Sequence, residues 1–275
     1  MAARLDATRS AVVRGYLPAR DPAAAAAATS LVDEALGHLR AFELRPIGEL
    51  RTRVVDEADW AEAWKRHFPV LRIGRRIVIR PTWRRHRATP GDVVLALDPG
   101  MAFGTGLHPT TRLCLAALEA LADRGLVAGT RVLDVGSGSG ILSIAAARLG
   151  AREVLAVDLD PIAVEATTAN ARRNRVARRI RARPGSVPTG EPPVDLVLAN
   201  LIASVLVRLA PDLAEALRPD GWCLASGIFR DREAEVRDAF GRAGLEVDER
   251  WAEEDWLALA ARRQGPAAPE PTIRP

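Results

Sequence analysis

The sequence predicts an α/β fold, a doubly wound and mostly parallel seven-stranded sheet, with a small α+β region preceding it. Three observations lead to this prediction. Short apolar runs alternate with helical patterns over residues 98–264, which is typical of a parallel sheet with helices on both faces. A glycine-rich turn joins one of these strands directly to a helix. The last two strand-like runs have no helix between them, so we expect them to pair antiparallel.

The elements of the sheet can be placed by their periodicity. The predicted strands are Arg131–Val135, Glu153–Val157, Arg179–Ala182, Leu196–Ala199 and Cys223–Ser226, and the predicted helices are Ile141–Leu149, Pro161–Arg173, Val205–Leu217 and Arg232–Arg242. The antiparallel pair comprises Leu245–Arg250 and Trp256–Ala260. Residues 265–275 are rich in proline and are predicted to be a disordered tail.

Residues 1–55 predict a small module that precedes the sheet. It contains one strand-like run (Ala11–Leu17), an alanine-rich helix (Pro22–Phe42) and a second strand-like run (Leu50–Val55). Pro22 suits the first turn of a helix that Asp21 would cap. The module is too small to be stable alone, so we expect it to serve recognition or docking.

Residues 56–97 predict a linker helix followed by a β-hairpin. Asp59 is a suitable N-cap, and Trp60 and Trp64 share one face of the helix that follows. These tryptophans could stack on a ligand, but packing of the linker helix against the main domain is the favoured interpretation. Apolar residues on either side of Gly74 predict the hairpin.

Composition and charge exclude several classes of protein. Of the 275 residues, 48% are hydrophobic and 27% charged, as in ordinary globular proteins. No run of 18 apolar residues predicts a membrane span, and the N-terminus has no signal-peptide core. Cys114 and Cys223 are far apart and form no metal-binding pair, so a reducing, cytoplasmic setting without a metal site is expected. The net charge of +4 is only a weak indication of nucleic-acid binding.

The glycine-rich turn is the strongest functional signal in the chain. Gly136, Gly138 and Gly140 follow a strand that carries Asp134, and a helix starts immediately afterwards. Glycines allow close approach of a ligand, and the helix N-terminus offers unpaired N–H groups. A dinucleotide fingerprint would need glycine at position 141, which is Ile141. The spacing therefore favours S-adenosylmethionine, which has no phosphate, over a nicotinamide cofactor. Asp134 could hold water or the amino group of that cofactor.

A second acid completes the expected cofactor site. Asp158 ends the next strand, where a carboxylate accepts hydrogen bonds from ribose hydroxyls in nucleotide-binding sheets. Capping of the following helix is the alternative role, but Asp160 is better placed for it. The glycine turn and Asp158 together are a strong signal, whereas either alone would be weak.

Two further segments narrow the interpretation. Asp98-Pro-Gly-Met-Ala-Phe-Gly-Thr-Gly-Leu-His-Pro-Thr-Thr111 and Asp195-Leu-Val-Leu-Ala-Asn200 resemble the ribosomal protein L11 methyltransferase (PrmA) family of class I S-adenosylmethionine-dependent methyltransferases. The similarity covers roughly residues 56–262. It implies methylation of lysine side chains and of the N-terminal amine of a large-subunit ribosomal protein. The sequence departs from the family at Leu107, where threonine is usual, and in a ferredoxin-like N-terminal domain that is reduced.

The resemblance also implies roles for single residues. The implied cofactor contacts are Thr111, Gly136, Asp158 and Asn200, with Phe103, Gly104 and Thr105 in a loop that covers the methionine end. Phe103 could face the sulfonium in a cation–π contact. Asn200 is the candidate that positions the acceptor amine through its side-chain carbonyl. His108 is expected to be a structural hydrogen-bonding residue, and the sequence identifies no general base.

Alternative functions remain open at this stage. The Arg172–Arg183 run holds seven arginines and could make a weak RNA contact, although a solvated helix face is the favoured interpretation. A methyltransferase that acts on another protein, RNA or a small molecule would have the same cofactor motifs. The absence of an Asn-Pro-Pro-aromatic signature after Asp195 makes nucleobases less favoured acceptors. A nicotinamide-dependent oxidoreductase and a catalytically silent binding protein are the remaining alternatives.

Overall fold

The computed structural model describes residues 22–41, 48–52, 68–98 and 106–265. Two compact units divide the chain at residues 67 and 68, and each is described here by itself. In the first unit, α1 (Pro22–Ala41) confirms the predicted alanine-rich helix. Residues 48–52 form no regular secondary structure, so the strand expected over Leu50–Val55 is absent from residues 50–52. The run Ala11–Leu17 and the linker helix with Trp60 and Trp64 lie outside the described residues.

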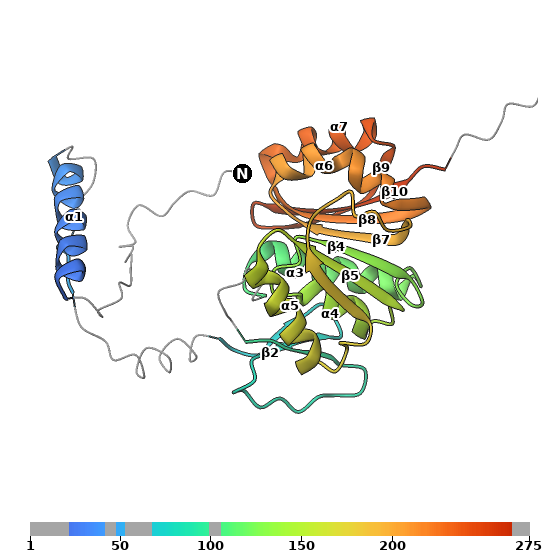
Figure 1. The fold of residues 1–275 in the computed structure, drawn as a ribbon, viewed down its shortest axis with the longest axis horizontal. Coiled ribbons are helices and arrows are strands. Elements are labelled where there is room, and N and C mark those ends of the chain that lie inside the picture. The colour runs from blue at the N-terminus through green and yellow to red at the C-terminus, as the bar shows by residue number, and fades with distance from the viewer. Residues whose placement is uncertain (1–21, 42–47, 53–67, 99–105, 266–275) are drawn as a thin grey trace, which may run out of the picture. The chain divides into compact units, whose positions relative to one another are not determined.

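The second unit contains the predicted seven-stranded sheet (Figure 1). Its strands are β4 (Arg131–Val135), β5 (Glu153–Asp158), β6 (Ile180–Pro184), β7 (Val194–Asn200), β8 (Leu217–Phe229), β9 (Leu245–Glu253) and β10 (Trp256–Arg263). They lie in the order β6-β5-β4-β7-β8-β10-β9. The first five are parallel, and β10 is antiparallel to both of its neighbours, which confirms the antiparallel pair predicted for the last two strands. The change of strand order beside β4 places the ends of β4, β5 and β7 at the switch point where ligands bind in such sheets.

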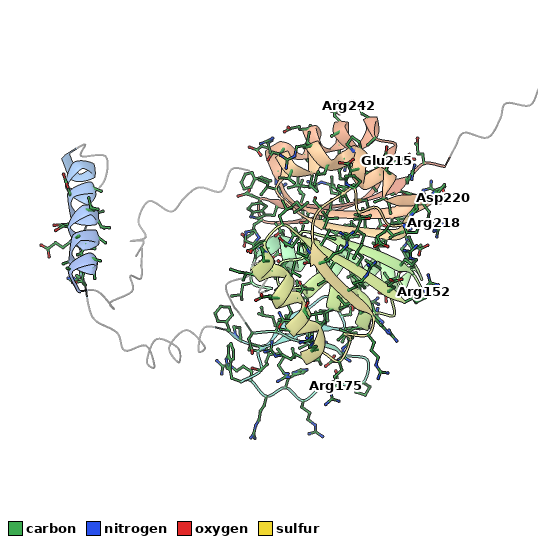
Figure 2. All side chains as sticks on the ribbon, in the orientation of Figure 1. Arg152, Arg175, Glu215, Arg218, Asp220 and Arg242 are labelled. Atoms are coloured by element: carbon green, nitrogen blue, oxygen red, sulfur yellow. The ribbon has the colours of Figure 1, made fainter. Side chains whose placement is uncertain are left out.

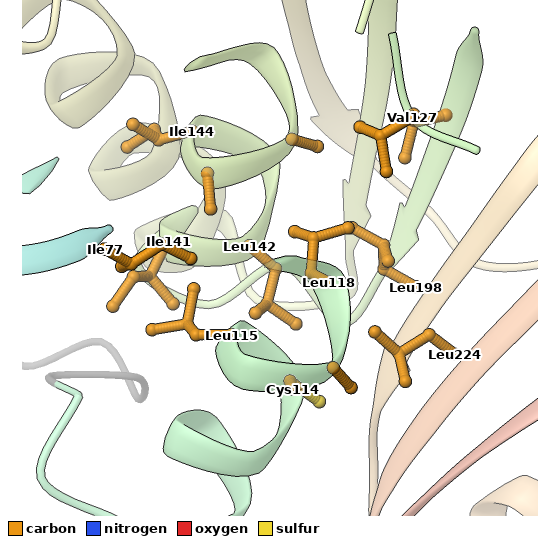
Figure 3. Close-up of a cluster of buried hydrophobic side chains, with 14 of the residues drawn as sticks. Ile77, Cys114, Leu115, Leu118, Val127, Ile141, Leu142, Ile144, Leu198 and Leu224 are labelled. Atoms are coloured by element: carbon orange, nitrogen blue, oxygen red, sulfur yellow. The ribbon is translucent and has the colours of Figure 1, made fainter. Parts of the chain in front are cut away.

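Helices cover both faces of the sheet. They are α3 (Pro109–Asp123), α4 (Ile141–Arg148), α5 (Pro161–Arg173), α6 (Ala203–Glu215) and α7 (Glu233–Arg242), with a short 3-10 turn η2 (Arg230–Arg232). One apolar core joins the sheet to α3 and α4, and a second joins it to α6 and α7. Figure 3 shows part of the first core, where side chains of α3 and α4 meet Leu198 and Leu224 of the sheet. The helix α3 was not among the predicted elements.

A small three-stranded sheet packs on the first core. It contains β1 (Leu71–Ile73), β2 (Ile77–Arg80) and β3 (Val93–Ala96). The antiparallel β1–β2 pair confirms the hairpin expected around Gly74, whereas β3, parallel to β2, was not predicted. Ile77 from β2 is fully buried near Ile141 of α4 (Figure 3). This packing makes the small sheet part of the same unit as the large one.

Two buried polar side chains attach the small sheet to the helices. Both carboxylate oxygens of Glu119 in α3 accept backbone hydrogen bonds at the hairpin turn, from Arg75 N at 2.8 Å and Arg76 N at 2.7 Å. The amide of Asn174, just after α5, pairs with the backbone of Ala96: it accepts from the N–H at 2.7 Å and donates to the carbonyl at 2.8 Å. These bonds satisfy groups that packing would otherwise leave unpaired.

Both cysteines are buried thiols in the core. Burial raises the pKa of Cys223 to about 12 and raises that of Cys114 still further, so neither is a reactive thiolate. Among the described helices, none is long and apolar enough to cross a membrane.

Candidate functional site

The glycine-rich turn between β4 and α4 forms the floor of the candidate site. Gly136, Gly138 and Gly140 all have positive φ angles, of 75°, 54° and 78°. Side-chain-bearing residues are strained there. Backbone N–H groups of Gly136 and Ser137 donate to Val157 O at 2.9 and 3.1 Å, which ties the turn to the end of β5. A Cβ on Gly136 would lie 2.5 Å from the Leu201 side chain, so only glycine fits between β4 and β7.

Side chains from α5 hold the same turn in place. Thr167 Oγ1 donates to Gly138 O at 3.1 Å, and Asn170 Nδ2 donates to Ser139 O at 2.9 Å. A Cβ on Gly140 would approach Thr167 to 2.9 Å. The turn is therefore fixed by the protein itself, before any ligand enters. Thr167 and Asn170 were not predicted as site residues, although their spacing of three residues places them on one face of the predicted helix.

Asp158 lies beside this turn at the end of β5. Its Oδ2 accepts a hydrogen bond from Gly138 N at 2.9 Å, and its Oδ1 accepts one from Asp160 N at 3.0 Å. These bonds orient the carboxylate and leave each oxygen a lone pair for a further donor. Asp160 caps α5 by accepting from Ile162 N at 2.9 Å, which confirms the capping role predicted for Asp160.

Asp134 lies in the interior beneath the turn. Only 1% of the residue is exposed, and its Oδ2 accepts hydrogen bonds from Ser143 N at 3.0 Å and Ser143 Oγ at 2.6 Å. Burial raises the pKa of Asp134 to about 6, against the lowering effect of the Ser143 bonds. The acid thus holds the first turn of α4 rather than facing the surface. Ser143, nine residues away, was not identified from the sequence.

The start of α3 contributes a second wall. His108 is the N-cap of this helix and accepts through Nδ1 from Thr110 N at 3.3 Å, which agrees with the structural role expected for it. Thr111, in the first turn, is completely buried, and its hydroxyl has no hydrogen-bond partner within the part of the chain that the structure describes. A buried hydroxyl without a hydrogen-bond partner costs free energy, so Thr111 offers a polar group with which a ligand of the site could pair.

Asn200 ends β7 and completes the site. It is half-buried and pairs in register with Ser226 of β8. Its side chain makes no hydrogen bond to any described residue, so its amide oxygen is available to a donor. The expected loop residues Phe103, Gly104 and Thr105 lie outside the described residues. The structure therefore brings together Thr111, Gly136, Gly138, Asp158 and Asn200 at one edge of the sheet.

The arginine-rich run lies at the other end of the unit. Because α5 starts at the site edge, the end of this helix and the start of β6 lie at the amino edge of the strands. Arg173, Arg179, Arg181 and Arg183 make internal hydrogen bonds, while Arg175 lies at the surface (Figure 2). Residues 22–41, 48–52, 68–98 and 106–265 contain no cluster of three or more His, Cys, Asp or Glu residues that could hold a metal ion.

The fold and the site together define a class I, S-adenosylmethionine-dependent methyltransferase. Comparison with known proteins identifies the family. Residues 4–264 match the family model for ribosomal protein L11 methyltransferase (PrmA), and the chain belongs to this family. The name of the family gives ribosomal protein L11 as the protein that its members methylate.

Individual relatives agree with this assignment. The chain is 47% identical to the ribosomal protein L11 methyltransferase of Chloroflexus aurantiacus, over 94% of this chain and 84% of the relative. It is 45% identical to that of Geobacter sulfurreducens, over 93% and 83%. The crystal structure of ribosomal protein L11 methylase from Lactobacillus delbrueckii superposes with a TM-score of 0.66 at 32% identity, covering 72% of this chain and 100% of that chain.

Proposed function

We propose that this enzyme methylates amino groups of ribosomal protein L11, both lysine side chains and the N-terminal amine. The proposal rests on family membership for the substrate and on the sequence resemblance for the type of acceptor. The observation that supports the cofactor position best is Asp158, oriented by Gly138 N beside the glycine turn. A cytoplasmic location follows from the proposal, because ribosomal proteins are made there.

The residues at the edge of the sheet fit S-adenosylmethionine. Asp158 would accept from the ribose hydroxyls, and the glycine turn, which carries no side chain at three positions, would let the cofactor approach the backbone closely. The orphaned hydroxyl of Thr111 would gain a partner from the cofactor. Phe103, Gly104 and Thr105 would cover its methionine end, as the sequence motif implies. Asp134 would act indirectly, by holding the first turn of α4 under the cofactor.

When bound, S-adenosylmethionine supplies a methyl group on a positively charged sulfur. The acceptor nitrogen would form the new C–N bond as the S–C bond breaks, S-adenosylhomocysteine would leave with the electron pair of that bond, and the nitrogen would lose a proton to water. Asn200 would orient the amine by accepting one of its N–H bonds through Oδ1. Positioning supplies much of the rate enhancement in such a displacement. A lysine amine with a pKa near 10.4 is rarely neutral at pH 7, at a cost of roughly 4–5 kcal/mol. An apolar surrounding lowers that cost because it disfavours the ammonium form.

A labelling experiment tests the proposed function. Purified enzyme is incubated with methyl-labelled S-adenosylmethionine and the separated large-subunit proteins, and the labelled protein is digested and analysed by mass spectrometry. We expect label on L11, at lysine side chains and at the N-terminal amine. Label on another protein, or on oxygen or carbon atoms of L11, would contradict the proposal.

A weak RNA contact through the Arg172–Arg183 run is a separate proposal about partners. Its support is the exposed position of Arg175, just after the C-terminal end of α5 and away from the site (Figure 2). Filter binding of ribosomal RNA fragments over a salt series tests it, because phosphate contacts weaken steeply with salt. Affinity that does not change with salt would contradict it.

A further inference from the structure

Exposed apolar side chains gather at the carboxyl edge of the large sheet. In the described part of the second unit, five large apolar residues are exposed: Leu107, Leu159, Ile162, Ile202 and Phe229. All five lie at this edge, after β5, after β7, at the end of β8 or before α3. Scattered exposed apolar residues need no explanation, but a group confined to one edge indicates an interaction surface.

Three of them, Leu107, Ile202 and Phe229, form or border an aromatic wall on the side of this edge that is away from Asp158. Trp256 at the start of β10 packs edge-on against Phe229, with ring centroids 5.3 Å apart, and against His108 at 4.9 Å. Leu107 precedes His108. Ile202 follows Leu201, whose backbone lies against the end of β8: Leu201 N donates to Ser226 O at 3.0 Å, and a Cβ on Gly227 would lie 2.1 Å from Leu201 O. The wall therefore runs from α3 past β10 and β8 to Ile202, two residues from Asn200.

Carboxylates border this wall. Asp231 lies two residues after Phe229, and Glu254 and Asp255 form the turn before Trp256. All three are exposed, and their carboxylates form no hydrogen bond or ion pair with any described residue. The nearby guanidinium groups of Arg112 and Arg232 are instead paired, with Glu253 and Glu235. The guanidinium of Arg230 donates to the backbone carbonyl of Glu254 at 2.6 Å. In a chain of net charge +4, this edge therefore sets three carboxylates against one guanidinium that has no carboxylate partner among the described residues, and its local charge is negative.

We propose that this surface, which we call the acceptor wall, docks the lysine-bearing segment of the protein substrate. It comprises Ile202, Phe229, Trp256, Asp231, Glu254 and Asp255. A lysine has an apolar stem and a cationic head, so it matches apolar and aromatic side chains bordered by carboxylates. The wall is continuous with Asn200, so a segment lying on it presents its amines to the site. This inference rests on the proposed function.

The test separates docking from chemistry. The triple variant Asp231→Asn/Glu254→Gln/Asp255→Asn and the single variant Phe229→Ala are compared with the wild type in methyl transfer to purified L11. We expect KM for L11 to rise about tenfold in each variant, as for the loss of a contact at the centre of an interface. The dissociation constant for S-adenosylmethionine should stay within about twofold of the wild-type value, because none of the substituted residues is a proposed cofactor contact.

Two controls sharpen this comparison. Glu215→Gln removes an exposed carboxylate at the far end of α6 and should leave KM for L11 unchanged (Figure 2). Phe229→Leu should restore much of the affinity lost in Phe229→Ala, because it restores an apolar side chain. The KM of the wild type should also rise with salt more steeply than that of the triple variant.

The outcomes are distinguishable. A wild-type enzyme that fails to methylate L11 overturns both the proposed function and the acceptor wall. An active wild type whose KM for L11 is unchanged in the triple variant and in Phe229→Ala overturns the acceptor wall alone. Thermal melts of every variant show whether a changed KM comes from lost folding, and a folded Phe229→Leu with near wild-type KM supports the role in docking.

Discussion

At the scale of single residues, Asp158 and Asn200 have separable roles. Asp158 is oriented by two backbone N–H groups, whereas the Asn200 side chain makes no bond to the described residues. We expect Asp158→Ala to weaken S-adenosylmethionine binding roughly 10–100-fold, because it removes hydrogen bonds to a charged acceptor. Asn200→Ala should reduce kcat more than it weakens cofactor binding. Calorimetric titration and steady-state kinetics measure the two effects, and unchanged binding in Asp158→Ala would contradict the site.

The raised pKa of Asp134 predicts that the free energy of unfolding depends on pH. Its pKa is raised by burial from 3.8 to about 6 in the folded protein, so the folded state holds the proton more tightly than the unfolded state. The resulting stabilisation is complete below pH 4 and is lost as the pH rises through 6. It amounts to about 3 kcal/mol at 1.36 kcal/mol for each pH unit.

The variant Asp134→Asn isolates this effect, because its Oδ1 can still accept both Ser143 hydrogen bonds. We expect its free energy of unfolding to lack the wild-type decrease between pH 4 and 6. Denaturant titrations over that range measure the difference. Ser143→Ala is the control: it removes one donor and should destabilise the protein by about 1–2 kcal/mol at pH 7. Parallel pH curves for the wild type and Asp134→Asn would disprove the assignment.

At the scale of elements, Asn174 attaches β3 to α5. Asn174→Ala would leave both the N–H and the carbonyl group of Ala96 without their partner. We expect the free energy of unfolding to fall by about 2 kcal/mol, since each unpaired backbone group costs about 1–3 kcal/mol and water can reach part of the Ala96 backbone. Thr168→Ala on the same helix removes one bond to Val164 O and should cost no more than about 0.5 kcal/mol. Urea unfolding of both variants checks the ranking, and equal losses would refute it.

Elements with strong local signals could be predicted from the sequence. The glycine turn, Asp158 and Asp160 were placed correctly, because turn chemistry and capping depend on neighbouring residues. The helix α3 was missed although Pro109 at its first position and a run free of glycine signal a helix. The strand β3 was missed because no tight turn joins it to β2, and its parallel pairing with β2 depends on tertiary packing.

Long-range contacts could not be predicted from one sequence. Asn174 meets Ala96 across 78 residues, and Thr111 shows its orphaned hydroxyl only when α3 is packed against the sheet. The motif predicts that Asp134 faces the ligand, yet its hydrogen-bond partner is Ser143 in the next helix. The sequence therefore identifies which residues belong to the site more reliably than it identifies the atoms that each one contacts.

At the scale of the whole molecule, cofactor binding should stabilise the second unit. The candidate site joins β4, β5 and β7 to α3, so a ligand there binds only the folded state. At a concentration of 100 times the dissociation constant, S-adenosylmethionine should raise the free energy of unfolding by about 2.7 kcal/mol. Thermal melts with increasing cofactor measure this gain. In Asp158→Ala the gain at the same concentration should be much smaller, and an equal gain would place the cofactor elsewhere.

The rigid turn held by Thr167 and Asn170 has a consequence for regulation. A preformed site binds the nucleoside and amino-acid parts of the cofactor. Those parts are the same before and after methyl transfer. The demethylated cofactor therefore competes with S-adenosylmethionine for the same binding site. The pace of ribosomal protein modification would then follow the cellular ratio of the two molecules, and the enzyme would slow whenever the demethylated form accumulates.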